Sequence, residues 1–281
     1  MKRIILIVAL VAVAGVAGIV RSHSKTGSIT EWPLIVHGDR ESTAADVREE
    51  IRKSYELSPG ARVEVSGING PVKIETSDTR TADIYIERTG ASQEVLNRRR
   101  IIIDSTQTGL TIRGEKGDGT FFARIFGAKP SEHLTLRLPK QISFGANGVN
   151  GSVIVGEIEG PVEIHGINGK VDIAQASGSA EFNGINGNIS VALKQLDNKG
   201  VEIHGINGNI ELRLSEGLNA ALEAHGMNGD IISDLSNVAV EKSGYGHYVA
   251  QIGSGGNSIS ASGINGNIRL TRMATAATPS D

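Results

Sequence analysis

The sequence predicts an all-β protein, a single-stranded β-solenoid (β-helix-like) whose coils take about 18–21 residues each. One observation is a short phrase, His-Gly-Ile-Asn-Gly at residues 165–169, which recurs with small changes along the chain. A second is the alternation of apolar and polar residues on both sides of each copy, which is typical of half-buried strands. A third is the regular spacing of the copies, which indicates a repeat architecture.

The glycine and asparagine residues of the repeated phrase form the predicted structural motif. Its members are Gly67, Asn69, Gly166, Asn168, Gly184, Asn186, Gly205, Asn207, Gly226, Asn228, Gly263 and Asn265. A degenerate copy lies at residues 148–151, with Asn150 at the asparagine position. The asparagines from 150 to 228 follow at intervals of 18, 18, 21 and 21 residues, whereas the last step takes 37. Because this step is close to two periods, we expect residues 245–251 to fill one missing copy.

Two architectures are compatible with this pattern. Asn-Gly between alternating strands is a hairpin signal, which predicts a sheet of antiparallel hairpins. In a solenoid, each period is one coil and equivalent positions stack as ladders about 4.8 Å apart. The solenoid accounts for the whole phrase, because glycine turns the corner with a positive φ, isoleucine fills the end of a flat core and stacked asparagines hydrogen-bond between coils. We therefore favour a solenoid, in which each coil depends on its neighbours for burial.

The repeated Gly-Ile-Asn-Gly resembles the bacterial "head GIN putative adhesin" family and a related β-strand-repeat family of unknown function. The similarity extends over about residues 49–272. It begins with Leu-Ser-Pro-Gly-Ala-Arg-Val-Glu-Val-Ser-Gly-Ile-Asn-Gly at residues 57–70 and ends with Gly-Ile-Asn-Gly-Asn-Ile-Arg-Leu at residues 263–270. The resemblance implies an adhesin-like or envelope-associated scaffold.

Composition excludes several classes of protein. Glycine makes up 36 of 281 residues, and aromatic residues only 4%, which is too few for a large globular core. The net charge of −3 argues against a nucleic-acid partner. The chain has no cysteine, which excludes disulfides, thiol chemistry and cysteine-ligated metals.

Residues 1–20 are typical of a targeting segment. Lys2 and Arg3 precede an apolar run at residues 4–20, which is the order found in secretory signals. The run is also close to the shortest helix that spans a membrane, so both a cleaved signal peptide and a retained inner-membrane anchor remain open. Either one predicts export to the periplasm or cell envelope, because the basic residues stay inside. Residues 21–41 are polar and patternless and predict a linker.

Residues 42–272 are assigned to one adhesin-like solenoid domain. At its start, Val47, Ile51 and Tyr55 share one helical face, which predicts a short capping helix at residues 42–56. A capping helix would cover the open strand edges of the first coil, and the alternative is a helix that docks on a membrane partner.

The domain is expected to have an irregular front half, residues 57–144, and a regular half of about seven coils, residues 145–272. Strands without the motif are predicted at residues 82–87, 100–104, 110–113 and 134–138, with a short helical insertion at residues 92–99. Residues 273–281 are rich in Ala, Thr and Pro and predict a disordered tail.

Residues 114–130 form a glycine-rich segment that contains Phe121, Phe122 and Phe126. One interpretation is a flap folded over an edge of the sheet. The other is an exposed apolar contact for a partner or a membrane surface, because clustered exposed aromatics mark interaction sites.

Alignment of the coils reveals a polar stripe. Glu163, Glu181, Glu202 and Glu223 occupy equivalent positions, and His165, Asn183, His204 and His225 follow two residues later. Residues two apart in a strand share a face, so the stripe is expected to point outward. Three interpretations remain open: a solvated polar face, a divalent-cation site and a pH-sensitive binding face. The candidate metal ligands are Glu202, His204, Glu223 and His225.

No catalytic or cofactor-binding residue and no cofactor is predicted, because the carboxylates repeat uniformly and no catalytic motif accompanies them. The leading hypothesis is a non-enzymatic envelope protein with a rigid face that binds an unidentified envelope protein or polysaccharide. The alternatives are a carbohydrate-active β-helix enzyme and a self-assembling envelope filament or regulatory module. An uncleaved N-terminal segment would add a membrane contact.

Overall fold

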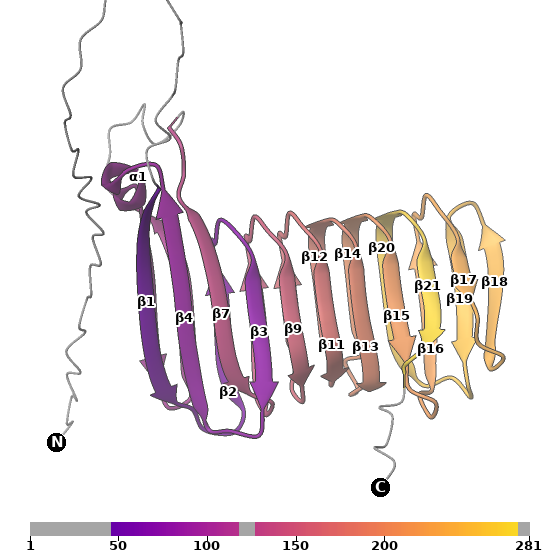
Figure 1. The fold of residues 1–281 in the computed structure, drawn as a ribbon. Helices are drawn as coiled ribbons and strands as arrows, with labels where there is room; N and C mark the ends of the chain where they lie inside the picture. The colour runs from indigo at the N-terminus through magenta and orange to yellow at the C-terminus, as the bar shows by residue number, and fades with distance from the viewer. Residues whose placement is uncertain (1–45, 118–126, 275–281) are drawn as a thin grey trace, which may run out of the picture.

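The computed structural model describes residues 46–117 and 127–274, which form two long β-sheets and one short helix (Figure 1). In spatial order, the ten-stranded sheet contains β1 (Val47–Glu56), β4 (Thr81–Gly90), β7 (Ser131–Pro139), β3 (Val72–Ser77), β9 (Val153–Ile158), β11 (Val171–Ser177), β13 (Ile189–Gln195), β15 (Ile210–Leu214), β21 (Ile268–Arg272) and β17 (Ile231–Ser233). The eleven-stranded sheet contains β18 (Val238–Gly244), β19 (His247–Ile252), β16 (Ala220–His225), β20 (Asn257–Asn265), β14 (Val201–Asn207), β12 (Ala180–Asn186), β10 (Val162–His165), β8 (Ile142–Asn147), β2 (Ala61–Ser66), β6 (Gly109–Lys116) and β5 (Arg99–Thr106). The helix α1 (Gln93–Asn97) lies between β4 and β5 in the chain.

Several predicted features lie outside the described residues. They are the targeting segment (residues 1–20), the linker (residues 21–41), the aromatic residues Phe121, Phe122 and Phe126, and most of the C-terminal tail. Within the described ranges, no helix is long and apolar enough to cross a membrane.

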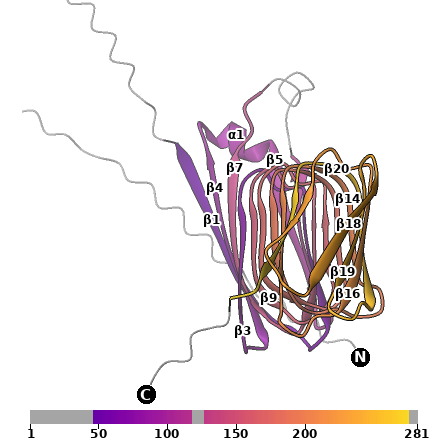
Figure 2. The ribbon, with the colours of Figure 1, turned by 90° about the vertical axis from the view of Figure 1, so that its right-hand side faces the viewer.

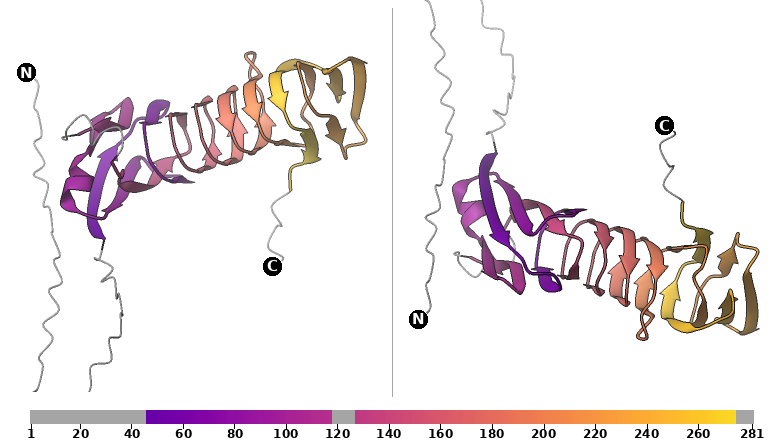
Figure 3. Two further views of the ribbon diagram at one scale, coloured as in Figure 1. Left: turned by 90° about the horizontal axis from the view of Figure 1, so that it is seen from above. Right: turned by 90° about the horizontal axis from the view of Figure 1, so that it is seen from below.

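The middle of the molecule consists of parallel strands stacked in register. Ile164 on β10 faces Phe182 on β12, which in turn faces Ile203 on β14. Consecutive strands such as β12 and β13 belong to opposite sheets, so they are not partners in a hairpin. Figures 2 and 3 show the strands on the two sides of one elongated stack. The mainly β fold with two long, largely parallel sheets is therefore confirmed, and it is consistent with a β-solenoid.

The core lies between the two sheets and is built from the apolar half of each alternating strand. Phe144 and Phe182 are its largest buried side chains. The isoleucine of the motif also points inward, and Ile167, Ile185 and Ile206 are each 1% exposed. The prediction that this residue fills the end of a flat core is thus confirmed, and each coil buries its apolar face against the next.

The motif asparagines form one unbroken ladder of side-chain hydrogen bonds. In spatial order its members are Asn69, Asn150, Asn168, Asn186, Asn207, Asn265 and Asn228. Each side-chain amide donates to the oxygen of the preceding one over 2.9–3.2 Å. The predicted coil-to-coil hydrogen bonds are confirmed, but the order of the coils differs from the order of the chain.

The C-terminal coil lies between two earlier coils. Strand β20 pairs with both β14 and β16, and β21 pairs with both β15 and β17. In Figure 1 the yellow strand β21 therefore separates β15 from β17. The predicted filling of a missing copy by residues 245–251 is wrong, because this segment belongs to β19, which runs antiparallel to β16 outside the motif stack. The 37-residue step is an excursion to the end of the molecule.

At the N-terminal end, too, the first motif coil pairs with strands that are distant from it in the chain. Strands β2 and β3 pair directly with β8 and β9, which lie about eighty residues further along the chain. The intervening strands β4, β5, β6 and β7 stack outside this first motif coil. They contain all four predicted motif-free strands, which are thus confirmed, and α1 confirms the short helical insertion. The Ser92 hydroxyl caps this helix by accepting from the Val95 N–H over 3.3 Å.

The predicted capping helix at residues 42–56 is wrong for the part that the structure describes. Residues 47–56 form β1, an edge strand that runs antiparallel to β4. Val47, Ile51 and Tyr55 are spaced by four residues, which suits one face of a helix but is also two periods of a strand. Pairing with β4 decides between the two, since Ile51 and Tyr55 pack against the core from an extended backbone.

Candidate functional site

Two columns of polar side chains run along the outer face of the eleven-stranded sheet. The register aligns Glu163, Glu181 and Glu202 in one column and His165, Asn183 and His204 in the other. Each histidine or asparagine lies two residues after a glutamate, so the two columns share a face. The predicted stripe is therefore confirmed for the coils of β10, β12 and β14.

The stripe does not continue as predicted to the last two candidate metal ligands. Because β20 inserts between β14 and β16, Ser260 separates Glu202 from Glu223. Ser262 likewise separates His204 from His225. The expectation that four equivalent coils follow one another is wrong here, and the structure does not bring the four candidate ligands together.

Arg62 balances the negative charge of the carboxylates at one end of the stripe. Its guanidinium lies 2.8 Å from Glu163 and also bonds Glu64, although Glu163 is about a hundred residues distant in sequence. The hydrogen bond from Arg62 lowers the pKa of the Glu163 carboxyl below its usual range. Sequence analysis missed this residue, because β2 becomes a neighbour of the stripe only through the displaced first coil.

Glu223 and His225, at the other end, meet a residue that sequence analysis did not select. His247 on β19 places its Nε2 3.4 Å from Glu223 Oε1, and His225 Nε2 lies 3.0 Å from the same oxygen. The two imidazole rings stack with their centroids 4.3 Å apart. The antiparallel pairing of β16 and β19 creates this cluster, and the repeat spacing carried no sign of it.

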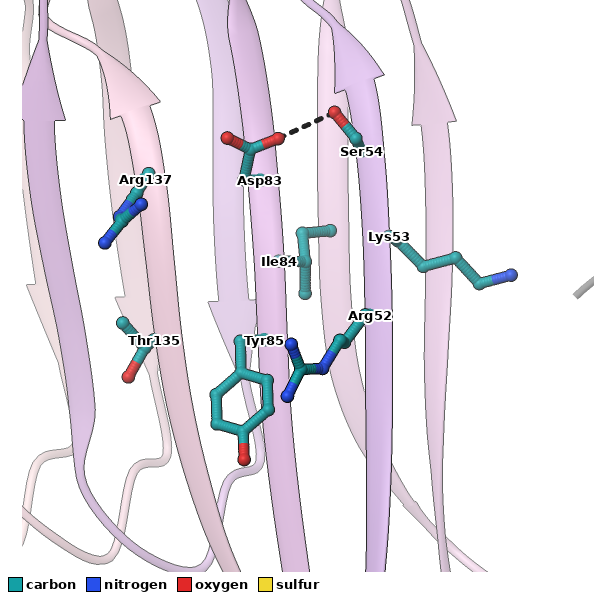
Figure 4. A pocket seen from close by; sticks show the side chains of 8 residues that line it. All are labelled: Arg52, Lys53, Ser54, Asp83, Ile84, Tyr85, Thr135 and Arg137. Carbon is teal, nitrogen blue, oxygen red and sulfur yellow. Dashed lines mark hydrogen bonds between the residues drawn. The ribbon is translucent and has the colours of Figure 1, made fainter. Parts of the chain in front are cut away.

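The outer face of the ten-stranded sheet carries a hollow of about 670 Å³ across β1, β4 and β7 (Figure 4). Its lining residues are Arg52, Lys53, Ser54, Asp83, Ile84, Tyr85, Thr135 and Arg137. Figure 4 shows Arg52 beside the Tyr85 ring, whereas Lys53 points away from it. The Ser54 hydroxyl donates to Asp83 over 2.7 Å, so this side of the hollow is held by a bond between neighbouring strands.

Charged groups surround the tyrosine of this hollow. The Arg52 guanidinium lies 4.9 Å from the centre of the Tyr85 ring, which is within cation–π distance. Arg48 donates to the Tyr85 hydroxyl over 3.1 Å, and this hydrogen bond raises the pKa of Arg48. A hydrogen bond from Arg52 lowers the pKa of Glu50, and the hollow therefore offers a polar rim around one aromatic ring.

A second hollow, of about 560 Å³, lies on the same face between β11 and β17. It is lined mainly by polar and charged side chains, among them Asp172, Glu211, Arg213 and Arg269. Arg213 on β15 reaches over β13 to donate to the carbonyl of Ile173 on β11 over 2.9 Å. Both hollows thus belong to one face, and both are lined mainly by outward positions of paired strands.

The fold and its columns of outward side chains define a repeat protein with two long, largely parallel sheets joined by a glycine–asparagine corner. Residues 147–271 match the Toastrack DUF4097 family model. The resemblance that the repeats indicated is thereby confirmed over the regular half of the molecule. No curated protein matches the chain.

Solved structures of low similarity were also found. A "putative cell adhesion protein" from Clostridium sporogenes is 12% identical, with 80% of this chain and 100% of that chain covered and a TM-score of 0.39. A "putative adhesin" from Bacteroides fragilis is 12% identical, with 79% and 97% covered and a TM-score of 0.33. A "putative lipid binding protein" from Parabacteroides distasonis is 13% identical, with 79% and 94% covered and a TM-score of 0.29.

Proposed function

We propose that the protein is a non-enzymatic scaffold of the cell envelope whose ten-stranded sheet binds an extended protein or polysaccharide on its outer face. The observation that carries this proposal is a row of outward positions, one from each strand. In spatial order the row is Arg52, Tyr85, Thr135, Lys73, Ile154, Asp172, Ser190, Glu211, Arg269 and Ile232. Ten strands about 4.8 Å apart make a face about 43 Å long, which suits an extended partner.

The composition of the row supports binding by many small contacts. Both hollows lie along it, and its aromatic, basic, acidic and hydroxyl groups alternate over short distances. Such a surface offers hydrogen bonds and one partly exposed aromatic ring to sugars or to a polar protein segment. The hydrogen-bonded ladders behind it keep these groups at fixed spacing, which reduces the entropy lost on binding.

Hydrogen bonds hold several surface carboxylates in the charged form. A glycosidase of the usual kind needs one carboxyl group whose pKa is raised, so that it can act as an acid. Among the described residues, the carboxyls with a clear shift are Glu50, Glu75, Glu163 and Asp230. Hydrogen bonds lower the pKa of each of them, which keeps these carboxylates ionised.

Export is part of the proposal and depends on residues 1–20, outside the described structure. Their basic start and apolar run suit either a cleaved signal or a retained inner-membrane anchor. Fractionation of cells that produce the full chain, followed by mass spectrometry of its N-terminus, tests this part. Recovery of an uncleaved chain in the cytoplasm would contradict it.

The binding proposal is tested with the purified protein on an array of bacterial surface polysaccharides and against an envelope protein fraction. Tyr85→Ala, Lys73→Ala and Glu211→Ala should each weaken binding several-fold, and their combination should weaken it further. Glu181→Ala and Ser260→Ala, on the opposite sheet, serve as matched controls and should change nothing. Release of new reducing ends from a bound polysaccharide, lost on replacing one or two carboxylates, would instead indicate an enzyme.

A further inference from the structure

Three metal-binding side chains converge near the C-terminal end of the eleven-stranded sheet. Glu223 and His225 lie two residues apart on β16 and therefore point to the same face. In the antiparallel pairing with β19, Ala224 is opposite Tyr248, which brings His225 and His247 together as the next facing pair. One carboxylate and two imidazoles thus come from two paired strands.

The separations between the donor atoms suit a small metal ion. Glu223 Oε1 lies 3.0 Å from His225 Nε2 and 3.4 Å from His247 Nε2, and the donor atoms of all three residues are within 4.8 Å of one another. Ligands at about 2.0–2.1 Å from a tetrahedral zinc ion lie about 3.3 Å from each other. Small side-chain adjustments would therefore let the three groups share one ion.

His247 is already oriented as a ligand. Its Nδ1 lies 2.8 Å from the Ser243 hydroxyl, whose oxygen accepts a hydrogen bond from Nδ1–H in one of the two tautomers. Its Nε2 is shielded from solvent and makes no hydrogen bond within the described part of the chain. Histidine ligands commonly donate their second ring N–H to an oxygen, which leaves the other lone pair for the metal. Ser243 fits this supporting role.

The backbone around His247 holds the ring in place. The Tyr248 hydroxyl lies within hydrogen-bond distance of the Gly229 carbonyl oxygen, at 2.9 Å, and of an Asp230 carboxylate oxygen, at 2.6 Å. The Met227 N–H donates to the Gly246 carbonyl over 3.1 Å, so the chain on both sides of His247 is tied to the last motif coil. A ligand fixed in this way loses little freedom when it binds a metal.

Binding of a metal ion requires the His225 ring to rotate, because it is stacked on the His247 ring. The rings of His225 and His247 are inclined by only 21°, so the two ring planes are nearly parallel and cannot both face one ion without a change in ring orientation. The His225 side chain is 52% exposed, and its ring can turn in solvent until its Nε2 faces the ion. Water can then complete the coordination, because Glu223 is also more than half exposed.

We propose that Glu223, His225 and His247 bind one zinc-like transition-metal ion. Two imidazoles with one carboxylate favour Zn²⁺ or a neighbouring transition metal over Ca²⁺ and Mg²⁺, which prefer oxygen ligands. The ion would clamp β19 to β16 at the end of the motif stack. This inference does not depend on the proposed binding scaffold.

The test is titration of the full chain, without a polyhistidine tag, with ZnCl₂ in a calorimeter and with CoCl₂ in a spectrophotometer. The expected result is saturable binding of one ion per chain, with a visible Co²⁺ spectrum of low coordination number. His225→Ala, His247→Ala and Glu223→Gln should each weaken binding by at least about tenfold, and Ser243→Ala by about tenfold. CaCl₂ should not compete.

His204→Ala is the matched control. His204 occupies the equivalent position on β14, but its ring faces the Ser262 hydroxyl at 2.6 Å in place of a second imidazole. Its removal should leave Zn²⁺ affinity unchanged. Circular dichroism checks that each variant keeps its β structure. If His247→Ala does not, His247→Gln is used in its place. The proposal is overturned by a lack of saturable binding, by binding that survives loss of both His225 and His247, or by equal weakening in His204→Ala.

Discussion

The two glycines of each motif have different physical roles, as Gly205 and Gly208 illustrate. Gly205 has a φ of 63°, and a Cβ built on it would approach no atom closer than 3.7 Å. Gly208 has a φ of 155°, and its Cβ would lie 2.3 Å from the carbonyl oxygen of Gly187 in the neighbouring coil. The first glycine is therefore required by backbone conformation, and the second also by the close approach of two coils.

Replacement by asparagine separates these roles. Asparagine tolerates the left-handed conformation, so Gly205→Asn should cost about 1 kcal/mol or less in the free energy of unfolding. Gly208→Asn forces two backbones apart and should cost about 3 kcal/mol or more. Thermal and urea unfolding of both variants provide the comparison. Equal effects would show that conformation alone explains both glycines.

The ion pair between Arg62 and Glu163 should make a small, pH-dependent contribution to stability. The folded protein lowers the pKa of Glu163, so the contribution is present above the unfolded pKa of about 4.3 and is lost as the pH falls through the folded value. Because the carboxylate is 39% exposed, we expect Glu163→Gln to cost about 0.2–1 kcal/mol at pH 7 and nothing near pH 2. A difference in melting temperature that grows on acidification would contradict this account.

At the scale of elements, most strands were predictable, but the partners of the strands outside the regular spacing were not. Alternation in the segments that became β4 and β7 identified both as strands, because burial on one face leaves a period of two. The same rule applied to β1 was ambiguous, since apolar residues every four positions suit a helix and a strand. Inward-facing Glu49, paired with Arg88 at 2.5 Å, was a missed sign of an edge strand.

A buried ion pair closes the N-terminal end of the motif stack. Glu132 on β7 is fully buried and accepts from the backbone N–H of Asn69, the first rung of the ladder, over 2.9 Å. Arg99 on β5 donates to the same carboxylate over 3.0 Å and also to the Gly67 carbonyl. One glutamate thus joins two motif-free strands to the first motif coil.

Glu132→Ala should therefore be severely destabilising. It leaves a largely buried guanidinium without its partner, a loss that typically costs about 3–5 kcal/mol. Glu50→Ala, at an exposed ion pair on β1, is the control and should cost far less, because solvent screens exposed ion pairs. Chemical unfolding of both variants gives the two values. A change for Glu132→Ala no larger than that of the control would contradict the role of this pair as a structural cap.

The candidate sites were predictable only where they follow the repeat. Glu163, Glu181 and Glu202 share one position in successive periods, so their alignment could be derived from spacing alone. Arg62 and His247 come from strands outside the regular spacing, and antiparallel or displaced pairing has no signature in the repeat. The Tyr85 hollow was missed for the same reason, because it needs the neighbours that β4 acquires in the fold.

At the scale of the whole molecule, every motif copy belongs to one continuous stack, with motif-free strands at both ends. The sequence lists the copies in chain order, and nothing in the repeated phrase specifies which copy is its neighbour. A 37-residue step therefore resembled a missing coil. In the structure, this stretch of chain forms β17, β18 and β19 at the end of the molecule. The chain then returns as β20 and β21, which lie between two coils that come earlier in the sequence.

Engineered disulfides test this order directly, because the chain has no cysteine. Neighbouring coils bring equivalent Cα atoms about 4.8 Å apart, which suits a disulfide, whereas a spacing of two coils is about 9.6 Å and does not. Asn186→Cys with Asn207→Cys is the positive control. After mild oxidation, mass spectrometry should show a bond in the Asn207→Cys, Asn265→Cys variant and none in the Asn207→Cys, Asn228→Cys variant. The reverse result would show that the coils stack in chain order and would contradict the continuous ladder described here.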